Sequence, residues 1–250
     1  MAFDRADLVF AIQEKEREVF SRMTRTPVVT LSHMTPLNFL DGKLAIPGRM
    51  LFVASDNSIN VHGIQTFIRE ALPLIRAQVP SAYLCLAGSI CKAVDEHSGV
   101  IKLGRVDDLQ SAYQHAQVIV NPVLFNTGLS IKNLEALGFG KPLVTATVGT
   151  EGMEAGIGTA FEAADSPTDF ALRCIGLLVD DSHRTAVTEG SIRYIEQCNR
   201  NIASTLADAL KRRVTAWNSS RYSGRGLKQS RWLRWYKHST QRPVLNPKFV

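Results

Sequence analysis

The strongest constraint on this chain is a regular alternation of short β-rich runs with amphipathic helical patterns between residues 49 and 179. Each apolar run ends at turn-forming residues, and apolar positions then recur every three or four residues. This alternation predicts an α/β fold, a Rossmann-like parallel sheet with helices on both faces. The expected strands are 50–54, 82–87, 100–103, 118–120 and 142–145, and the expected helices between them are 61–79, 109–116 and 129–137.

The flanking segments carry weaker patterns of the same kind. A strand at 8–12, a helix at 14–23 and a strand at 28–31 precede a linker rich in Pro and Gly. After the main alternation we expect a sixth strand at 159–162, then helices at 167–179, 183–198 and 202–215.

The net charge of +6 comes from the end of the chain. Eleven Lys and Arg but no acidic residue follow position 210, whereas residues 1–210 hold 18 basic and 23 acidic side chains. This acidic body argues against nucleic-acid binding. We expect no membrane-spanning helix and no secretory signal, hence a cytoplasmic protein. The four cysteines form no C-x-x-C pair, which indicates reduced thiols and no zinc site.

Ligands bind open parallel sheets at the carboxyl ends of the strands, and one turn there is the most informative. It runs through Asn126, Thr127, Gly128 and Leu129 into the helix that carries Lys132 and Glu135. Backbone N–H groups at that helix N-terminus, together with the lysine, can bind a diphosphate. The carboxylate can accept hydrogen bonds from two ribose hydroxyls. An alternative is a cap by Thr127 with a Lys132–Glu135 surface pair.

Two other turns add candidates. Asn57, Asn60 and His62 follow the first strand of the main sheet, and Arg105 follows the third. The acidic pair 107–108 suits an N-cap for the next helix better than a ligand contact. No P-loop, nucleophile-elbow or H-E-x-x-H motif is present, which argues against an NTPase, an α/β hydrolase or a zinc protease.

Four segments of the chain, taken in order, resemble the nucleotide-sugar-binding half of group 1 (family 4-like) GT-B glycosyltransferases over about residues 49–179. The segments are GRVDDL at 104–109, VIVNP at 118–122, TGLSIKNLEALGFGKPLVT at 127–145 and GTEG at 149–152. The resemblance implies transfer of a sugar from a UDP- or GDP-sugar to a glycan or lipid-linked acceptor, in polysaccharide biosynthesis. It implies no other cofactor, and no metal site is expected.

The resemblance also implies roles for individual residues. Glu135 matches the second glutamate of the family's E-x7-E motif, which binds the ribose, and Thr127 stands where the first glutamate contacts the donor sugar. Lys132 and Arg105 are the candidates for stabilising the departing diphosphate. Asn57, Asn60 and His62 occupy the turn where the family often has a basic pair.

Domain boundaries follow from the same comparison. We expect a remnant of the N-terminal GT-B domain at 1–35, a linker at 36–48, the nucleotide-sugar-binding domain at 49–200, a C-terminal helix at 201–218 and a basic aromatic tail at 219–250. Since the family uses two Rossmann-like domains, most of the first is missing.

The missing domain leaves several functions open. The chain is a truncated enzyme, one half of a two-chain enzyme with a separate N-terminal-domain partner, or a non-catalytic nucleotide-sugar-binding subunit. An epimerase-like enzyme acting on the nucleotide sugar is a weaker alternative.

The tail itself has two interpretations. Its basic stretch at 228–237, with Trp232, Trp235 and Tyr236, either contacts the inner face of a membrane peripherally or is a solvated tail.

Overall fold

The structure is a computed structural model that describes residues 3–125 and 128–222, with side chains up to 212. The chain divides between Leu206 and Ala207 into two compact units, and the main sheet lies in the first. The unit from Ala207 onward is helical as far as Tyr222.

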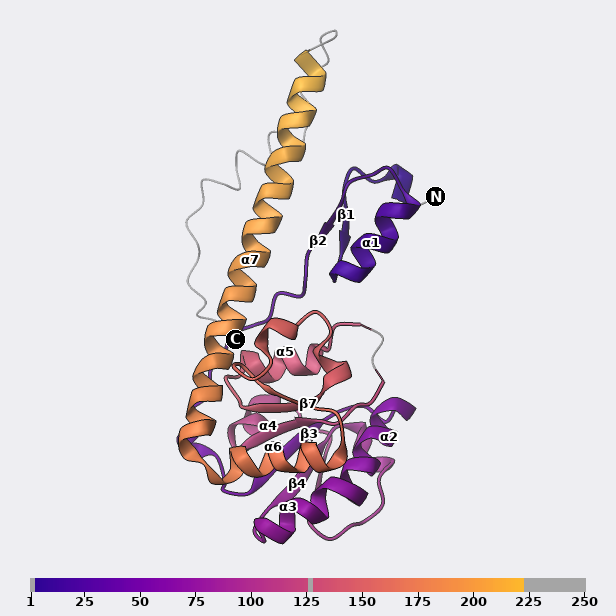
Figure 1. The fold of residues 1–250 in the computed structure, drawn as a ribbon. Helices are drawn as coiled ribbons and strands as arrows, with labels where there is room; N and C mark the ends of the chain where they lie inside the picture. Colours follow the sequence, from indigo (N-terminus) through magenta and orange to yellow (C-terminus); the bar gives the residue numbers. More distant parts are fainter. Residues whose placement is uncertain (1–2, 126–127, 223–250) are drawn as a thin grey trace. The chain divides into compact units, whose positions relative to one another are not determined.

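The main sheet has six parallel strands in the order β5-β4-β3-β6-β7-β8, which confirms the predicted Rossmann-like α/β fold (Figure 1). The strand order turns at β3, because the chain proceeds outward through β4 and β5 on one side and through β6, β7 and β8 on the other. The strands are β3 (Arg49–Val53), β4 (Tyr83–Ala87), β5 (Val100–Gly104), β6 (Val118–Asn121), β7 (Leu143–Ala146) and β8 (Glu162–Ala164).

Helices cover both faces of this sheet (Figure 1). Alternate residues of β3 face opposite ways, so Phe52 packs toward α2, α3 and α6, whereas Leu51 packs toward α4, α5 and the first part of α7. Strands of a parallel sheet that is buried on both faces have continuous apolar sequences, as the strands of this chain do. The helices are α2 (Ser58–Thr66), α3 (Leu72–Gln78), α4 (Leu109–Gln114), α5 (Ile131–Gly138), α6 (Pro167–Val179) and α7 (Asp181–Tyr222).

The helix expected at 61–79 is a composite of α2, a π-helical turn η3 (Phe67–Ala71) and α3. Pro73 lies in the first turn of α3 and has no N–H to donate to the preceding turn. The regular α-helical hydrogen-bond pattern is therefore interrupted by the wider π turn, next to the proline that cannot donate.

Two expectations about the end of the first unit were wrong. The sixth strand lies at 162–164 rather than 159–162, because the N–H groups of Ala160 and Phe161 bond the Gly156 carbonyl in a turn. The helices expected at 183–198 and 202–215 are one helix, α7. Asn199 lies within this helix, and its side chain bonds both backbone groups of Thr35, at 3.0 and 2.7 Å.

The N-terminal segment, residues 3–30, contains the predicted strand, helix and strand. Its parallel pair β1 (Val9–Ala11) and β2 (Val28–Thr30) flanks α1 (Glu14–Met23), which has no buried residue. The linker, with the 3-10 turn η2 (Gly42–Leu44), bonds the end of α5 through Asn38 N to Gly138 O at 2.9 Å. Other 3-10 turns are η1 (Phe3–Arg5), η4 (Ser89–Lys92), η5 (Thr147–Thr150) and η6 (Glu154–Gly156).

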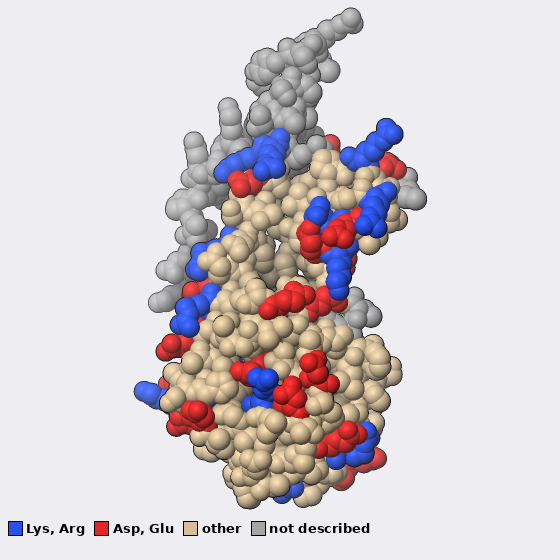
Figure 2. All heavy atoms as spheres, in the orientation of Figure 1, with Lys and Arg blue, Asp and Glu red and all other residues tan. Residues whose placement is uncertain are grey.

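Acidic and basic side chains are intermixed on the face shown in Figure 2. All four cysteines are free thiols, and Cys85 and Cys174 are buried. In the described part of the chain no helix is long and apolar enough to span a membrane.

Candidate functional site

The sheet itself indicates where a ligand binds. β3 and β6 are neighbours, paired at Met50 with Val118, but their onward connections leave in opposite directions. Such a switch point opens a crevice at the carboxyl ends of the two strands, where open α/β sheets bind ligands. α2 begins after β3 and α5 after β6, so the candidates Asn60 and Lys132 come from its two sides.

Lys132 comes from α5, which follows β6 on one side of this switch point. Its Nζ donates a hydrogen bond to Asn60 Oδ1 at 2.7 Å and lies 5.9 Å from the centre of the Phe52 ring. Its pKa is lowered, because partial burial disfavours the charged form. No carboxylate among the described residues forms an ion pair with it. A partly buried cation balanced by a neutral amide and an aromatic face is suited to bind an anion.

Glu135 lies three residues later on α5 and is also half-buried. Its Oε1 is buried without a hydrogen-bond partner in the described part of the chain. Burial raises the pKa of this carboxyl, while the interaction with the Tyr113 hydroxyl works against that rise. Among the described residues Lys132 Nζ bonds Asn60 and forms no ion pair with Glu135, whereas the Thr127 cap of the alternative lies outside the described residues. A buried acceptor lacking a donor fits a hydroxyl-bearing ligand.

A buried amide network centres on Asn133, the residue after Lys132 on α5. Asn133 accepts from Asn121 Nδ2 at 2.7 Å and donates to Thr145 Oγ1 at 3.1 Å and to the Gly149 carbonyl at 2.8 Å. A Cβ on Gly149 would lie 2.6 Å from Thr145 Oγ1. The network joins the ends of β6 and β7 to α5 and fixes the loop after β7.

The sequence patterns did not single out this network or Tyr113. Asn133 occupies a position of α5 that packs inward among apolar neighbours, and Thr145 is fully buried within β7. The sequence signal that could have found this network is a polar residue at a position where the helix or strand pattern expects an apolar one.

The three candidate residues in the turn after β3 lie in different environments. Asn57 caps α2, its Oδ1 accepting from Asn60 N at 2.9 Å. Asn60 is only 2% exposed and also donates to the Ser55 carbonyl at 2.9 Å. His62 is exposed, with its ring centre 6.1 Å from that of Phe125.

The structure does not bring Arg105 to Lys132. It follows the edge strand β5, its side chain is 93% exposed, and its Nε lies 3.8 Å from Asp107. Asp108 holds the N-cap position of α4, as expected, but makes no capping hydrogen bond with its side chain.

The turn before α5 is described in part. Asn126 and Thr127 lie outside the described residues. Gly128 has a φ of +151°, and Leu129 packs partly buried against the α5 side of the core. The helix starts at Ile131 after Ser130, two residues later than expected.

Residues of the N-terminal segment lie beside the same loops. Lys15 Nζ is 2.8 Å from the Glu151 carboxylate. A Cβ on Gly128 or Gly152 would lie within 4 Å of the Gln13 side chain, whose buried Oε1 has no hydrogen-bond partner in the described residues. No sequence pattern had singled out Gln13.

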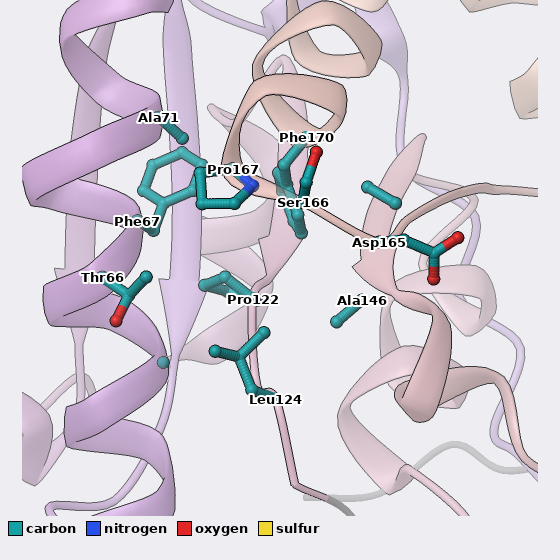
Figure 3. Close-up of a pocket in the computed structure, with 12 residues that line it drawn as sticks. Thr66, Phe67, Ala71, Pro122, Leu124, Ala146, Asp165, Ser166, Pro167 and Phe170 are labelled. Atoms are coloured by element: carbon teal, nitrogen blue, oxygen red, sulfur yellow. The ribbon is translucent and has the colours of Figure 1, made fainter.

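A hollow lies between α2 and α6, beside the carboxyl ends of β6, β7 and β8 (Figure 3). Apolar groups dominate its lining, and among the described residues that line it Asp165 alone is charged. None of these residues is a predicted site residue, and the chemistry of the hollow does not suit a diphosphate. It is lined by Gly63, Thr66, Phe67, Ala71, Pro122, Leu124, Ala146, Ala164, Asp165, Ser166, Pro167 and Phe170.

Metal ligands do not gather in the described part of the chain, where no group of three or more His, Cys, Asp or Glu could hold an ion.

Solved structures share this fold. A mutant of Staphylococcus aureus TarM, in complex with Fondaparinux, α-GlcNAc-glycerol and UDP, matches with a TM-score of 0.67 and 12% identity, covering 82% of this chain and 44% of that one. The pneumococcal O-GlcNAc transferase GtfA, in complex with UDP and GlcNAc, gives 0.63 and 14%, covering 84% and 46%. A GtfA/B complex gives 0.63 and 15%, covering 83% and 46%.

Among curated proteins, an "Uncharacterized 44.6 kDa protein in cps region" of Klebsiella pneumoniae is 22% identical over 150 residues, which are 55% of this chain and 39% of that one. This chain therefore spans less than half the length of these relatives. The family model described as glycosyl transferases group 1 matches residues 47–180, more than half of the chain. The fold and this match confirm the predicted GT-B C-terminal half, and the chain belongs to the group 1 glycosyl transferases.

Proposed function

We propose that this chain binds a nucleotide diphosphate sugar and forms the donor-binding part of a glycosyltransferase that acts on a glycan or lipid-linked acceptor. One observation carries the proposal: α5 places a partly buried ammonium and a partly buried carboxylate at the switch point of the sheet. In the described residues Lys132 has no carboxylate partner, and Glu135 Oε1 has no donor. An anion and a group bearing hydroxyls would satisfy both.

The two side chains suit different parts of such a ligand. Lys132 would bind the diphosphate and stabilise the negative charge that develops as the bond to the sugar breaks. Glu135 offers acceptors that can bridge the two ribose hydroxyls. The Gly149 carbonyl accepts a hydrogen bond from Asn133, the residue after Lys132, so the loop after β7 is tied to α5. We assign Arg105 no role in this stabilisation of the leaving group. Its side chain is exposed, and it follows β5 at the edge of the sheet rather than β3 or β6.

UDP is the first nucleotide to test, because the TarM mutant and GtfA structures are complexes with UDP. The sugar and the acceptor are open, and a role in polysaccharide biosynthesis rests on the resemblance.

A second candidate is a nucleotide-sugar-binding subunit without turnover of its own. The chain covers 44–46% of the TarM and GtfA chains, and a GtfA/B complex is among the matching structures. The GtfA/B complex supports a function that depends on a partner protein.

The test is a calorimetric titration of the purified chain with UDP, GDP and their sugars, for the wild type and Glu135→Ala. We expect binding of at least one nucleotide and loss of most of that affinity in the variant. Absence of binding, or binding that Glu135→Ala leaves intact, would contradict the donor site. Transfer to an added acceptor by the chain alone separates the enzyme from the subunit.

The cytoplasmic location and the peripheral membrane contact stay predictions. The basic stretch at 228–237 lies outside the described residues, and co-sedimentation with anionic vesicles tests it.

A further inference from the structure

We infer that Asn60 is a positioning residue that directs the Lys132 ammonium toward the bound diphosphate. This inference rests on the proposed function, because it assigns Asn60 a role through the lysine rather than through contact with the ligand. The resemblance marks this turn only as one where a basic pair is missing. The structure shows a neutral side chain in that turn bonded to a cation that comes from the other side of the switch point.

Asn60 can hold the lysine because it is itself fixed. It is 2% exposed, and its Nδ2 donates to the Ser55 carbonyl at 2.9 Å and to Ser55 Oγ at 3.2 Å. Both amide hydrogens are thereby used within the turn after β3. The orientation of the amide follows from these bonds, so its Oδ1 must face Lys132.

The turn that carries Asn60 is supported in its own right. Asn57 Oδ1 accepts from the Asn60 N–H, and the Asp56 N–H donates to Ser89 Oγ at 3.1 Å. The Ser89 hydroxyl in turn donates to Asp56 Oδ1 at 2.9 Å. Side chains from the ends of β3 and β4 therefore hold the start of α2 in place.

The hydrogen bond to Asn60 does not prevent the Lys132 ammonium from binding a ligand. An ammonium has three donors, and Asn60 accepts one of them while Phe52 lies under the charge. A carboxylate at position 60 would neutralise the cation and repel a diphosphate. A neutral acceptor orients the ammonium and leaves its charge for the ligand, which explains an asparagine at this position.

A double-mutant cycle on UDP and uridine tests this role, with Asn60→Ala, Lys132→Ala and the double variant. UDP is measured by calorimetry and uridine by ligand-observed NMR, and thermal unfolding confirms that each variant is folded. We expect Asn60→Ala to weaken UDP binding about tenfold, the effect of losing one hydrogen bond to a charged group, and to leave uridine binding unchanged. In the Lys132→Ala background, Asn60→Ala should cost nothing further.

Three results overturn the inference: equal losses for UDP and uridine, additive losses in the double variant, or unchanged UDP affinity in Asn60→Ala. If Asn60→Ala does not fold, Asn60→Asp serves in its place. It should lose more UDP affinity than tenfold while retaining uridine, and unchanged UDP affinity would again overturn the inference. A wild-type chain that binds neither UDP nor uridine would instead contradict the proposed function.

Discussion

Lys132 Nζ lies 2.7 Å from Asn60 Oδ1, so one hydrogen bond joins α5 to α2 across the carboxyl ends of β6 and β3. Removing the ammonium should remove the attraction for the diphosphate. Lys132→Ala is expected to weaken UDP about 10- to 100-fold and to leave uridine unchanged, as for the loss of a charged hydrogen bond. Calorimetry at two salt concentrations measures this, since the remaining UDP binding should depend less on salt.

The matched control is Lys43→Ala, which removes an equal charge from an exposed position in the linker. A similar loss of UDP affinity in both variants would assign the effect to net charge rather than to Lys132.

Glu135 should determine recognition of the ribose. Glu135→Ala is expected to weaken UDP about tenfold and to remove the preference for UDP over 2′-deoxy-UDP, because this carboxylate, whose Oε1 has no donor among the described residues, can accept from a ribose hydroxyl. Competition binding with the two nucleotides measures the preference. Glu189→Ala, an exposed glutamate of α7, is the control. A preference for UDP that survives in Glu135→Ala would place the ribose elsewhere.

Lys141 should make stability depend on pH. It is 2% exposed, its Nζ bonds the Gln114 and Ala116 carbonyls, and burial lowers its pKa to about 8. Between pH 8 and the ordinary lysine pKa of about 10.4, the unfolded chain binds more protons than the folded one. The free energy of unfolding should therefore gain from this residue as pH rises through that window, by at most about 1.4 kcal/mol per pH unit.

Urea unfolding of the wild type and Lys141→Met across this window isolates that contribution, because all other titrating groups are shared. The difference in unfolding free energy between the two proteins should change steadily with pH, the wild type gaining on the variant. A constant difference would show that the lysine keeps its proton in the folded chain.

Gly149 is required by packing. Its Cβ would lie 2.6 Å from Thr145 Oγ1 and 3.3 Å from Asn133 Nδ2, both buried. Gly149→Ala should destabilise the fold by about 1–3 kcal/mol, as overpacking does in other cores. Gly42→Ala is the control, since nothing lies within 4 Å of its Cβ, and should stay within about 0.5 kcal/mol. Chemical denaturation compares them, and equal stability of the two variants would contradict the packing explanation.

The fold could be predicted from local patterns because each strand and helix carries its own periodicity. The five main strands lie within one residue of their predicted bounds. α7 was not predicted as one helix: Asn199, between the two expected helices, bonds Thr35, 164 residues away in sequence, and local patterns do not show such a contact. The shift of the sixth strand likewise depends on a turn at Gly156 that competes with the ladder.

The site was predictable only in part. Spacing on α5 placed Lys132 and Glu135 one turn apart, but it could not show that one bonds Asn60 and the other lies near Tyr113. Those partners come from other elements, and only the strand order brings them together. The amide network at Asn133 and the exposure of Arg105 are likewise properties of packing.

A calorimetric titration of UDP into the wild-type chain and the Lys132→Ala and Glu135→Ala variants, under identical conditions, tests the nucleotide site most directly. A site at the switch point of the sheet predicts saturable binding of one UDP to the wild type, with most of the affinity lost in each folded variant. No binding to the folded wild type, or equal affinity in all three proteins, would contradict a nucleotide site at this position.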